Sequence, residues 1–404
     1  MRFRISRKRK LNFTDSNAEI KEQDLAQPVG RQLFIDNLRW TTIILVISMH
    51  AADTYSPLGS WYFVDRRPIS VPTCVFFAAW QMYLQAFFMG MLFLIAGYFV
   101  PHSFDRKGPW MFMRDRLYRL GLPVLLYMLV IGPVTEYFVA RSWTSTVPTS
   151  FAHEWLKHIQ NGEVLQENGP LWFCVALLIF SAVYTVIRVA KVSTTSKASS
   201  NSCPVPVQIV CFGLLMAPAT FLTRLSRPSS VFNLPLGDFS QYVLMFGAGI
   251  VAARRQWMSG LRLVIGVRLL IICVIPGLAV WYGMLFLGGF FRGDGFAFYG
   301  GLHWQNAAFA TWESLICVGM CYGLLAIFRA WFNEQGSLSR FLSANTFSVY
   351  VFHPPVLVLA ARLLQGFSWP SFAMFLALWL TAAIATFALS AAVFRRIPFL
   401  RRIL

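Results

Sequence analysis

Charged residues are scarce in this chain. Asp, Glu, Lys and Arg make up 13% of its 404 residues, whereas soluble proteins carry roughly 25%. Hydrophobic residues make up 57%, and apolar stretches of about 20 residues recur along nearly the whole length, which is typical of a helical membrane protein. The composition therefore excludes a soluble domain and predicts an all-α, polytopic bundle of membrane-spanning helices.

Acidic residues are rarer than basic ones. The chain has 17 acidic and 35 basic residues, for a net charge of +18. This excess does not predict a nucleic-acid partner, because the basic residues cluster in short segments between the apolar stretches. Such clusters mark the cytoplasmic side of a membrane protein. Both termini are therefore expected to be cytoplasmic.

Cysteine pairs and metal-binding motifs are also missing. The seven cysteines form no CxxC pair, and Cys317 and Cys321 have no adjacent histidine or acid. We interpret the cysteines as small buried hydrophobic residues. Neither a metal site nor a permanently bound cofactor is expected.

The first residues lack the apolar segment that would follow the basic run in a signal peptide. We expect a disordered basic cytoplasmic arm over 1–30, a ten-helix membrane domain over 31–395 and a basic cytoplasmic tail over 396–404. The ten expected spans are 38–56, 73–100, 120–139, 169–190, 204–223, 238–253, 263–288, 306–328, 344–362 and 371–394.

His50 is an ionisable residue inside an expected span, where its burial in lipid costs free energy. Asp36 and Arg39 stand at the entrance of that span, and His50 follows Arg39 by eleven residues. At helical rise this is about 16 Å, near the middle of the membrane. Ionisable residues at such depth usually have a function; a hydrogen bond to a neighbouring helix is the structural alternative.

Two further ionisable residues lie inside expected spans. His353 is followed by Pro354 and Pro355, which interrupt helical hydrogen bonding; a proline kink alone is the structural alternative there. Glu313 falls near mid-membrane in another span, and a buried carboxylate needs a partner. A histidine at the same depth is the expected partner.

Two more features lie at the ends of spans. Arg116 and Arg119 are three residues apart, so on a helix they share a face suited to a phosphate; ordinary positive-inside charge is the alternative. Trp172, in "NGPLWFCVALL", stands at the outer mouth of the fourth span and has the position of an interfacial aromatic residue.

Four motifs occur in a fixed order along the chain. They are Arg39 and His50 separated by ten residues, Arg116-x-x-Arg119, "GPLWF" (169–173) and "YVFHPPV" (350–356). In this order, on ten spans, they resemble the acyltransferase-3 family of integral membrane acyltransferases over about residues 31–395. For His353 and Glu313, the resemblance is to a subset of this family that is similar to glucan-modifying succinyltransferases.

The resemblance implies an O-acyltransferase of the bacterial cytoplasmic membrane. It would move an acetyl, succinyl or similar group from a cytoplasmic acyl-CoA, as co-substrate, to a hydroxyl of a glycan, lipid or small molecule, as in the O-acetylation of cell-envelope polysaccharides. A direct transfer is preferred to a covalent acyl-histidine. The implied site residues are His50 as general base with Glu313 and His353 as catalytic partners, Arg39, Arg116 and Arg119 as donor-binding residues, and Trp172 and Asp36 as candidate pocket residues.

A proton-coupled secondary transporter is the alternative. His50, Glu313 and His353 would then form a proton relay, which suits ionisable residues and prolines within spans. The sequence lacks a visible inverted repeat, which counts against a transporter. A catalytically idle export partner is a third hypothesis.

Overall fold

The computed structural model of the protein describes residues 32–59, 61–65, 67–140, 150–162, 164, 168–190, 203–225 and 233–403. The expected N-terminal arm, 1–30, and the last residue of the expected tail lie outside these ranges. Over the described residues the chain forms helices and no regular strand. This confirms the predicted all-α, polytopic helical class.

The helices are α2 (Leu33–Tyr55), α3 (Val71–Arg116), α4 (Leu122–Leu126), α5 (Gly132–Ala140), α6 (Phe151–Gln160), α7 (Trp172–Ala190), α8 (Pro206–Arg224), α9 (Phe239–Arg254), α10 (Leu263–Leu287), α11 (Trp304–Trp331), α12 (Ser337–Leu364), α13 (Ser371–Ala392) and α14 (Pro398–Ile403). Short π-helical segments, Leu117–Gly121 and Tyr127–Ile131, join α3, α4 and α5. The fourth to eighth spans and the tenth agree with the expected bounds to within three residues.

Eight helical segments within the described ranges are long and apolar enough to cross a membrane. The difference from the ten expected spans has two causes. The expected second and third spans belong to one continuous helical run, Val71–Tyr137. Helix α2 is not among the eight, because Asn37, Arg39, His50 and Asp53 lower its apolar content.

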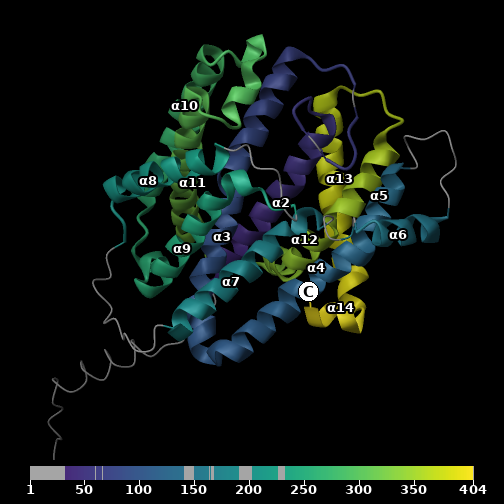
Figure 1. Ribbon diagram of the computed structural model, residues 1–404, viewed down its shortest axis with the longest axis horizontal. Helices are drawn as coiled ribbons and strands as arrows, with labels where there is room; N and C mark the ends of the chain where they lie inside the picture. Colours follow the sequence, from purple (N-terminus) through teal and green to yellow (C-terminus); the bar gives the residue numbers. More distant parts are fainter. Residues whose placement is uncertain are drawn as a thin grey trace, which may run out of the picture.

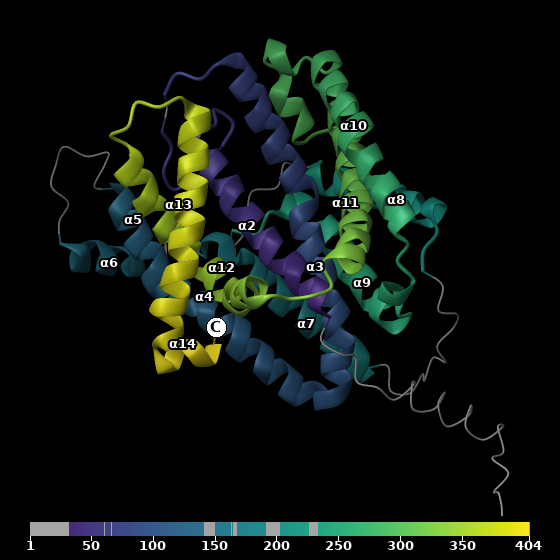
Figure 2. The ribbon, with the colours of Figure 1, turned by 180° about the vertical axis from the view of Figure 1, so that it is seen from behind.

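Helix α3 changes direction near its end. Gly108 has φ 74° and ψ 168°, a conformation that glycine adopts without steric cost, and Pro109 follows it. Beyond this bend the helix runs across one end of the bundle toward α4 (Figure 2). The expected basic connection between the second and third spans is therefore helical and covers that end.

Helix α2 lies inside the bundle (Figure 1) and contacts α3, α11, α12 and α13. Asn37, near its start, donates hydrogen bonds of 2.7 and 2.9 Å to the carbonyls of Phe332 and Glu334, just after α11. The start of α2 thus meets the end of α11, and the two helices run in opposite directions. We call this end of the bundle the Asn37 end and the opposite end the Trp304 end.

Close helix contacts depend on glycine. A Cβ on Gly97 of α3 would lie 2.1 Å from the Phe246 carbonyl oxygen of α9, and one on Gly249 of α9 would lie 2.1 Å from the Leu94 oxygen. Small residues let membrane helices approach until their backbones touch. This contact fixes the position of α3, which carries polar side chains toward the interior.

Candidate functional site

His50 is held by a carboxylate one helical turn later. Its Nδ1 lies 3.2 Å from Oδ2 of Asp53, and the other oxygen of Asp53 accepts a 2.6 Å hydrogen bond from Gln81 of α3. Gln81 in turn accepts a 2.8 Å bond from the Ser56 hydroxyl. Because a carboxylate only accepts, Nδ1 of His50 carries the proton and Nε2 presents a lone pair. The result is an oriented base.

Two further rings lie parallel to His50. The ring centroids of His50 and Trp61 are 3.5 Å apart at an interplanar angle of 13°. The His353 ring lies 5.5 Å from that of His50 at 12°. The indole Nε1 of Trp61 is buried and has no hydrogen-bond partner among the described residues. A free N–H donor therefore stands beside the base.

His353 is oriented by the proline that follows it. Pro354 has no N–H, so the Tyr350 carbonyl four residues earlier is free of its usual helical partner. Nδ1 of His353 donates to that carbonyl at 2.7 Å. Its Nε2 is buried with no partner among the described residues. Helix α12 nevertheless continues through both prolines, so the expected interruption is limited to hydrogen bonds.

The connection that carries Trp61 is fastened at both sides. The Asp65 amide donates to the Thr54 carbonyl at 2.8 Å. Arg67 bonds Asp65 at 2.5 Å and also donates to the carbonyls of Phe367 and Trp369, before α13, at 3.1 and 2.9 Å. The hydrogen bond that Arg67 donates to Asp65 raises the pKa of Arg67, which keeps the guanidinium charged. Trp61 therefore covers His50 from an anchored loop.

A cavity of 310 Å³ opens between α2, α3, α7 and α12 at the Asn37 end, with Asp36, Arg39 and Arg116 in its lining. Arg39 lies 3.4 Å from Asp36, and its guanidinium sits 4.8 Å over the Phe99 ring. The cavity reaches Tyr350, whose carbonyl holds His353. It therefore extends from a basic mouth into the bundle as far as Tyr350, three residues before His353, and neither histidine lines it.

Arg119 and Trp172 lie beside this cavity rather than in its lining. Arg119 belongs to a π-helical turn, which has more residues per turn than an α-helix. Arg119 therefore does not share the face of Arg116 as closely as expected. Its charge still acts on Arg116. Trp172 packs on Tyr242 with ring centroids 5.4 Å apart, while its neighbour Phe173 faces the cavity.

Glu313 is not the carboxylate beside His50. It accepts a 2.6 Å hydrogen bond from Arg224 at the end of α8 and lines a separate cavity of 430 Å³. Asp53 occupies the position beside the imidazole where Glu313 was expected. Arg224 itself is buried.

Two residues of the site escaped the sequence analysis. The pattern His50-x-x-Asp53 places imidazole and carboxylate on one helix face and was a usable signal. Trp61 had no such signal, because its stack on His50 depends on how the connection between α2 and α3 folds back.

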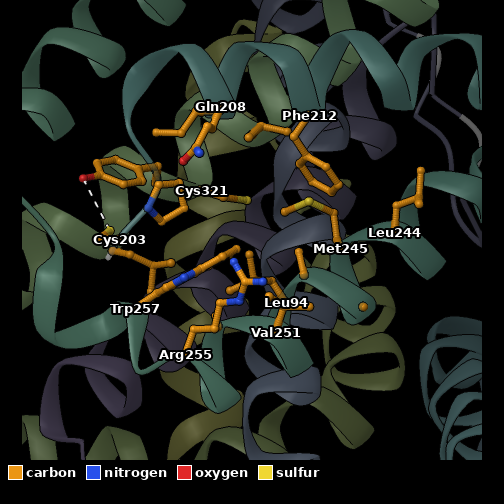
Figure 3. A pocket seen from close by; sticks show the side chains of 18 of the residues that line it. Leu94, Cys203, Gln208, Phe212, Leu244, Met245, Val251, Arg255, Trp257 and Cys321 are labelled. Atoms are coloured by element: carbon orange, nitrogen blue, oxygen red, sulfur yellow. Dashed lines mark hydrogen bonds between the residues drawn. The ribbon is translucent and has the colours of Figure 1, made fainter. Parts of the chain in front are cut away.

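A further cavity, larger than the two described above, has a different character. It measures 660 Å³ and lies between α8, α9 and α11. Figure 3 shows mainly apolar side chains around it, with Gln208 and Arg255 as polar members. No residue of α2 or α12, the helices that carry His50 and His353, lines it, so we do not assign the chemistry to this cavity.

Comparison with known proteins gives one extended match. The model of a family described as an acyltransferase domain, acyltransferase-3, matches residues 32–395. Curated relatives from Salmonella paratyphi B and Salmonella heidelberg, both called glucans biosynthesis protein C, are 27% identical over 158 residues, which is 39% of this chain and 38% of each relative. The match thus spans less than half the length of these relatives. No solved structure matches the chain.

Proposed function

The chain belongs to the acyltransferase-3 family, and from this premise we propose that it is a membrane O-acyltransferase that transfers an acyl group from acyl-CoA to a hydroxyl. The observation that carries the proposal is the His50–Asp53 pair on α2, the helix whose earlier residues Asp36, Arg39 and Ile43 line the arginine-lined cavity. A base oriented by a carboxylate is what a weak hydroxyl nucleophile requires.

The transfer is a direct displacement. The acceptor hydroxyl gives its proton to Nε2 of His50 while its oxygen attacks the thioester carbonyl carbon. The tetrahedral intermediate collapses, the carbon–sulfur bond breaks, and the thiolate takes the proton back from Nε2. An ester and free CoA thiol result. Asp53 stabilises the transient imidazolium, as the acid does in hydrolase triads.

Trp61 and His353 divide the remaining roles. The negative oxygen of the intermediate needs a donor, and the unpartnered Nε1–H of Trp61 suits that role. His353 does not suit that role, because its proton is on Nδ1 and its Nε2 has only a lone pair to offer. We assign it to accept a hydrogen bond from a second hydroxyl of the acceptor, beside the one that attacks.

The arginines bind the donor. Arg39 and Arg116 line the basic mouth, and guanidinium groups pair well with phosphate. Ligand pockets range from about 300 to 1,000 Å³, so the 310 Å³ cavity holds only part of a molecule as large as acyl-CoA. We infer that the pantetheine arm enters, while the nucleotide stays outside near Arg119.

The acceptor and the location follow from the relatives and the basic residues. The name of the Salmonella relatives refers to glucans, which favours a glucan hydroxyl as acceptor. The basic mouth would face the cytoplasm, where acyl-CoA is made, and both termini would lie on that side of a bacterial cytoplasmic membrane.

A proton relay receives less support. It would require His50, Glu313 and His353 to exchange protons, but Glu313 bonds Arg224 and lines a different cavity. Of the three residues of that relay, His50 and His353 are the two that lie together, with their rings stacked.

The test is acyl transfer by purified protein in nanodiscs. Radiolabelled acetyl-CoA or succinyl-CoA is supplied with a gluco-oligosaccharide, and labelled sugar is measured together with released CoA thiol. His50→Ala should lower the rate by about 10²–10⁴-fold, because the base is lost. His102→Ala, at an exposed position of α3, serves as the control and should retain full activity. Equal rates for His50→Ala and the wild type would refute the proposed function.

A further inference from the structure

The 430 Å³ cavity toward the Trp304 end contains a buried ion cluster. Arg224 bonds both Asp238 and Glu313. Only 6% of Arg224 and 2% of Glu313 are exposed to solvent. Gln85 of α3 donates to the second oxygen of Asp238 at 3.5 Å. All four side chains line the cavity, so its wall contains charges that are rarely buried without a purpose.

Hydrogen-bonding capacity remains unused in this cluster. Nη1 of Arg224 is buried and has no partner among the described residues. Two carboxylates face one guanidinium, so the cluster carries a net charge of −1 when all three groups are ionised. That sign disfavours an anion as occupant and suits a neutral ligand with several hydroxyl groups, which donate to carboxylates and accept from a guanidinium.

Aromatic rings complete the wall. The Phe309 ring lies 5.2 Å from the Arg224 guanidinium carbon, and Tyr299 meets Phe309 edge-on with ring centroids 5.8 Å apart. Tyr299 is half exposed, so part of its ring remains open to a ligand. An aromatic face beside carboxylate and amide groups suits a ring that is apolar on its faces and polar at its edge. A sugar has this chemistry.

Helix α3 links this cavity to the histidine pair. Gln81 bonds Asp53 of the base, and Gln85, one helical turn later, bonds Asp238 of the cluster. Residues four apart on a helix have Cβ atoms about 5–6 Å apart. A sugar chain with one unit in the cavity therefore has further units within reach of His50.

We propose that this cavity binds a neutral sugar unit of the acceptor glycan. The inference rests on the proposed function for the reaction but assigns a separate binding site to residues outside the catalytic group. The carboxylates accept hydrogen bonds from the hydroxyl groups, and the Gln85 amide donates or accepts there. Nη1 of Arg224 donates to a ring or hydroxyl oxygen, and Tyr299 covers an apolar face.

Binding is measured without turnover to separate the two proposals. The His50→Ala protein in nanodiscs is titrated with a linear glucose tetrasaccharide by calorimetry. Adding Gln85→Leu should weaken binding about tenfold or more, as expected for loss of a hydrogen bond within a charged cluster. Gln208→Leu, which changes an amide in the 660 Å³ cavity, is the matched control and should bind as tightly as its parent.

Folding is monitored by thermal unfolding of each variant, and Tyr299→Ala provides a second variant at a half-exposed position. Weaker binding by either variant with unchanged unfolding supports the inference. Absence of tetrasaccharide binding, or equal binding by parent, Gln85→Leu and Tyr299→Ala, overturns it. Transfer that depends on His50 but not on Gln85 or Tyr299 would leave the proposed function standing alone. Binding that depends on Gln85 without any transfer would leave only the inference.

Discussion

At the scale of single residues, Asp53 gives His50 its direction. An imidazole can carry its proton on either nitrogen, and only the Nδ1–H form leaves Nε2 free to act as a base. The Asp53 carboxylate selects this form and is itself held by Gln81. In the proposed transfer, the same carboxylate would stabilise the imidazolium form of His50.

Asp53→Asn should therefore reduce kcat by about 10²–10⁴-fold with little change in donor KM, because an amide can donate to Nδ1 and stabilise the wrong tautomer. Steady-state kinetics with varied acyl-CoA provides the measurement. Asp105→Asn removes a carboxylate that pairs with Arg188 and Arg254 away from the site and should leave kcat unchanged. Wild-type kcat in Asp53→Asn would contradict the assigned role.

Arg116 and Arg114 offer a second comparison at this scale. Arg116 lines the donor cavity, whereas Arg114 is exposed on the same helix and does not. Arg116→Ala should raise the KM for acyl-CoA about tenfold or more with a nearly unchanged kcat, because uniform donor binding is lost. Arg114→Ala should change neither constant. Similar KM values for the two variants would argue against a phosphate site at Arg116.

At the scale of elements, helix α12 lacks the backbone hydrogen bond to the Tyr350 carbonyl, and this absence positions His353. Pro354 leaves the Tyr350 carbonyl free, and His353 bonds it instead. Pro355 leaves the Val351 carbonyl free in the same way, but no histidine contact depends on it. The two neighbouring prolines therefore differ in their expected effect on the reaction.

Pro354→Ala restores an N–H that competes with His353 for Tyr350. We expect kcat to fall about tenfold, while the protein becomes no less stable, because proline is the least favourable residue inside a helix. Pro355→Ala should keep its activity. Activity assays and thermal unfolding in detergent measure both effects; a greater loss of activity in Pro355→Ala than in Pro354→Ala would show that the Tyr350 bond is unimportant.

The sequence predicts elements better than it predicts partners. Apolar length located nearly every span, and the spacing of Arg39 and His50 marked the helix that carries the base. The pair of Glu313 and Arg224 joins residues 89 positions apart, and no local pattern encodes such a contact. The stack of Trp61 on His50 likewise depends on the path of a loop, which hydropathy does not describe.

At the scale of the whole molecule, the two polar cavities lie at different depths in the bundle. The arginine-lined cavity is at the Asn37 end, and the cavity with Glu313 is toward the Trp304 end. By the expectation drawn from the basic connections, the Asn37 end would face the cytoplasm. Donor and acceptor would accordingly arrive from opposite sides.

This arrangement predicts sided use of the donor. Inverted membrane vesicles should consume acyl-CoA added to the medium, whereas right-side-out vesicles should not, because acyl-CoA cannot cross the bilayer to reach the Arg39 mouth. Release of CoA thiol into the medium measures consumption, and detergent should restore activity in right-side-out vesicles. Equal consumption by both kinds of intact vesicle would contradict the assigned sidedness.

The anchored loop that carries Trp61 has a consequence for the membrane as a barrier. Arg67 fastens that loop above His50, and the donor arm would fill the cavity beneath. The acyl group would then be the only part of the donor to cross from one side of the membrane to the other. The reaction would then move the acyl group in one direction across the membrane, although neither CoA nor the acceptor crosses it. CoA would be released on the side where it is made. The free energy of thioester cleavage would drive the acyl group to the other side, through a protein that never opens a pore.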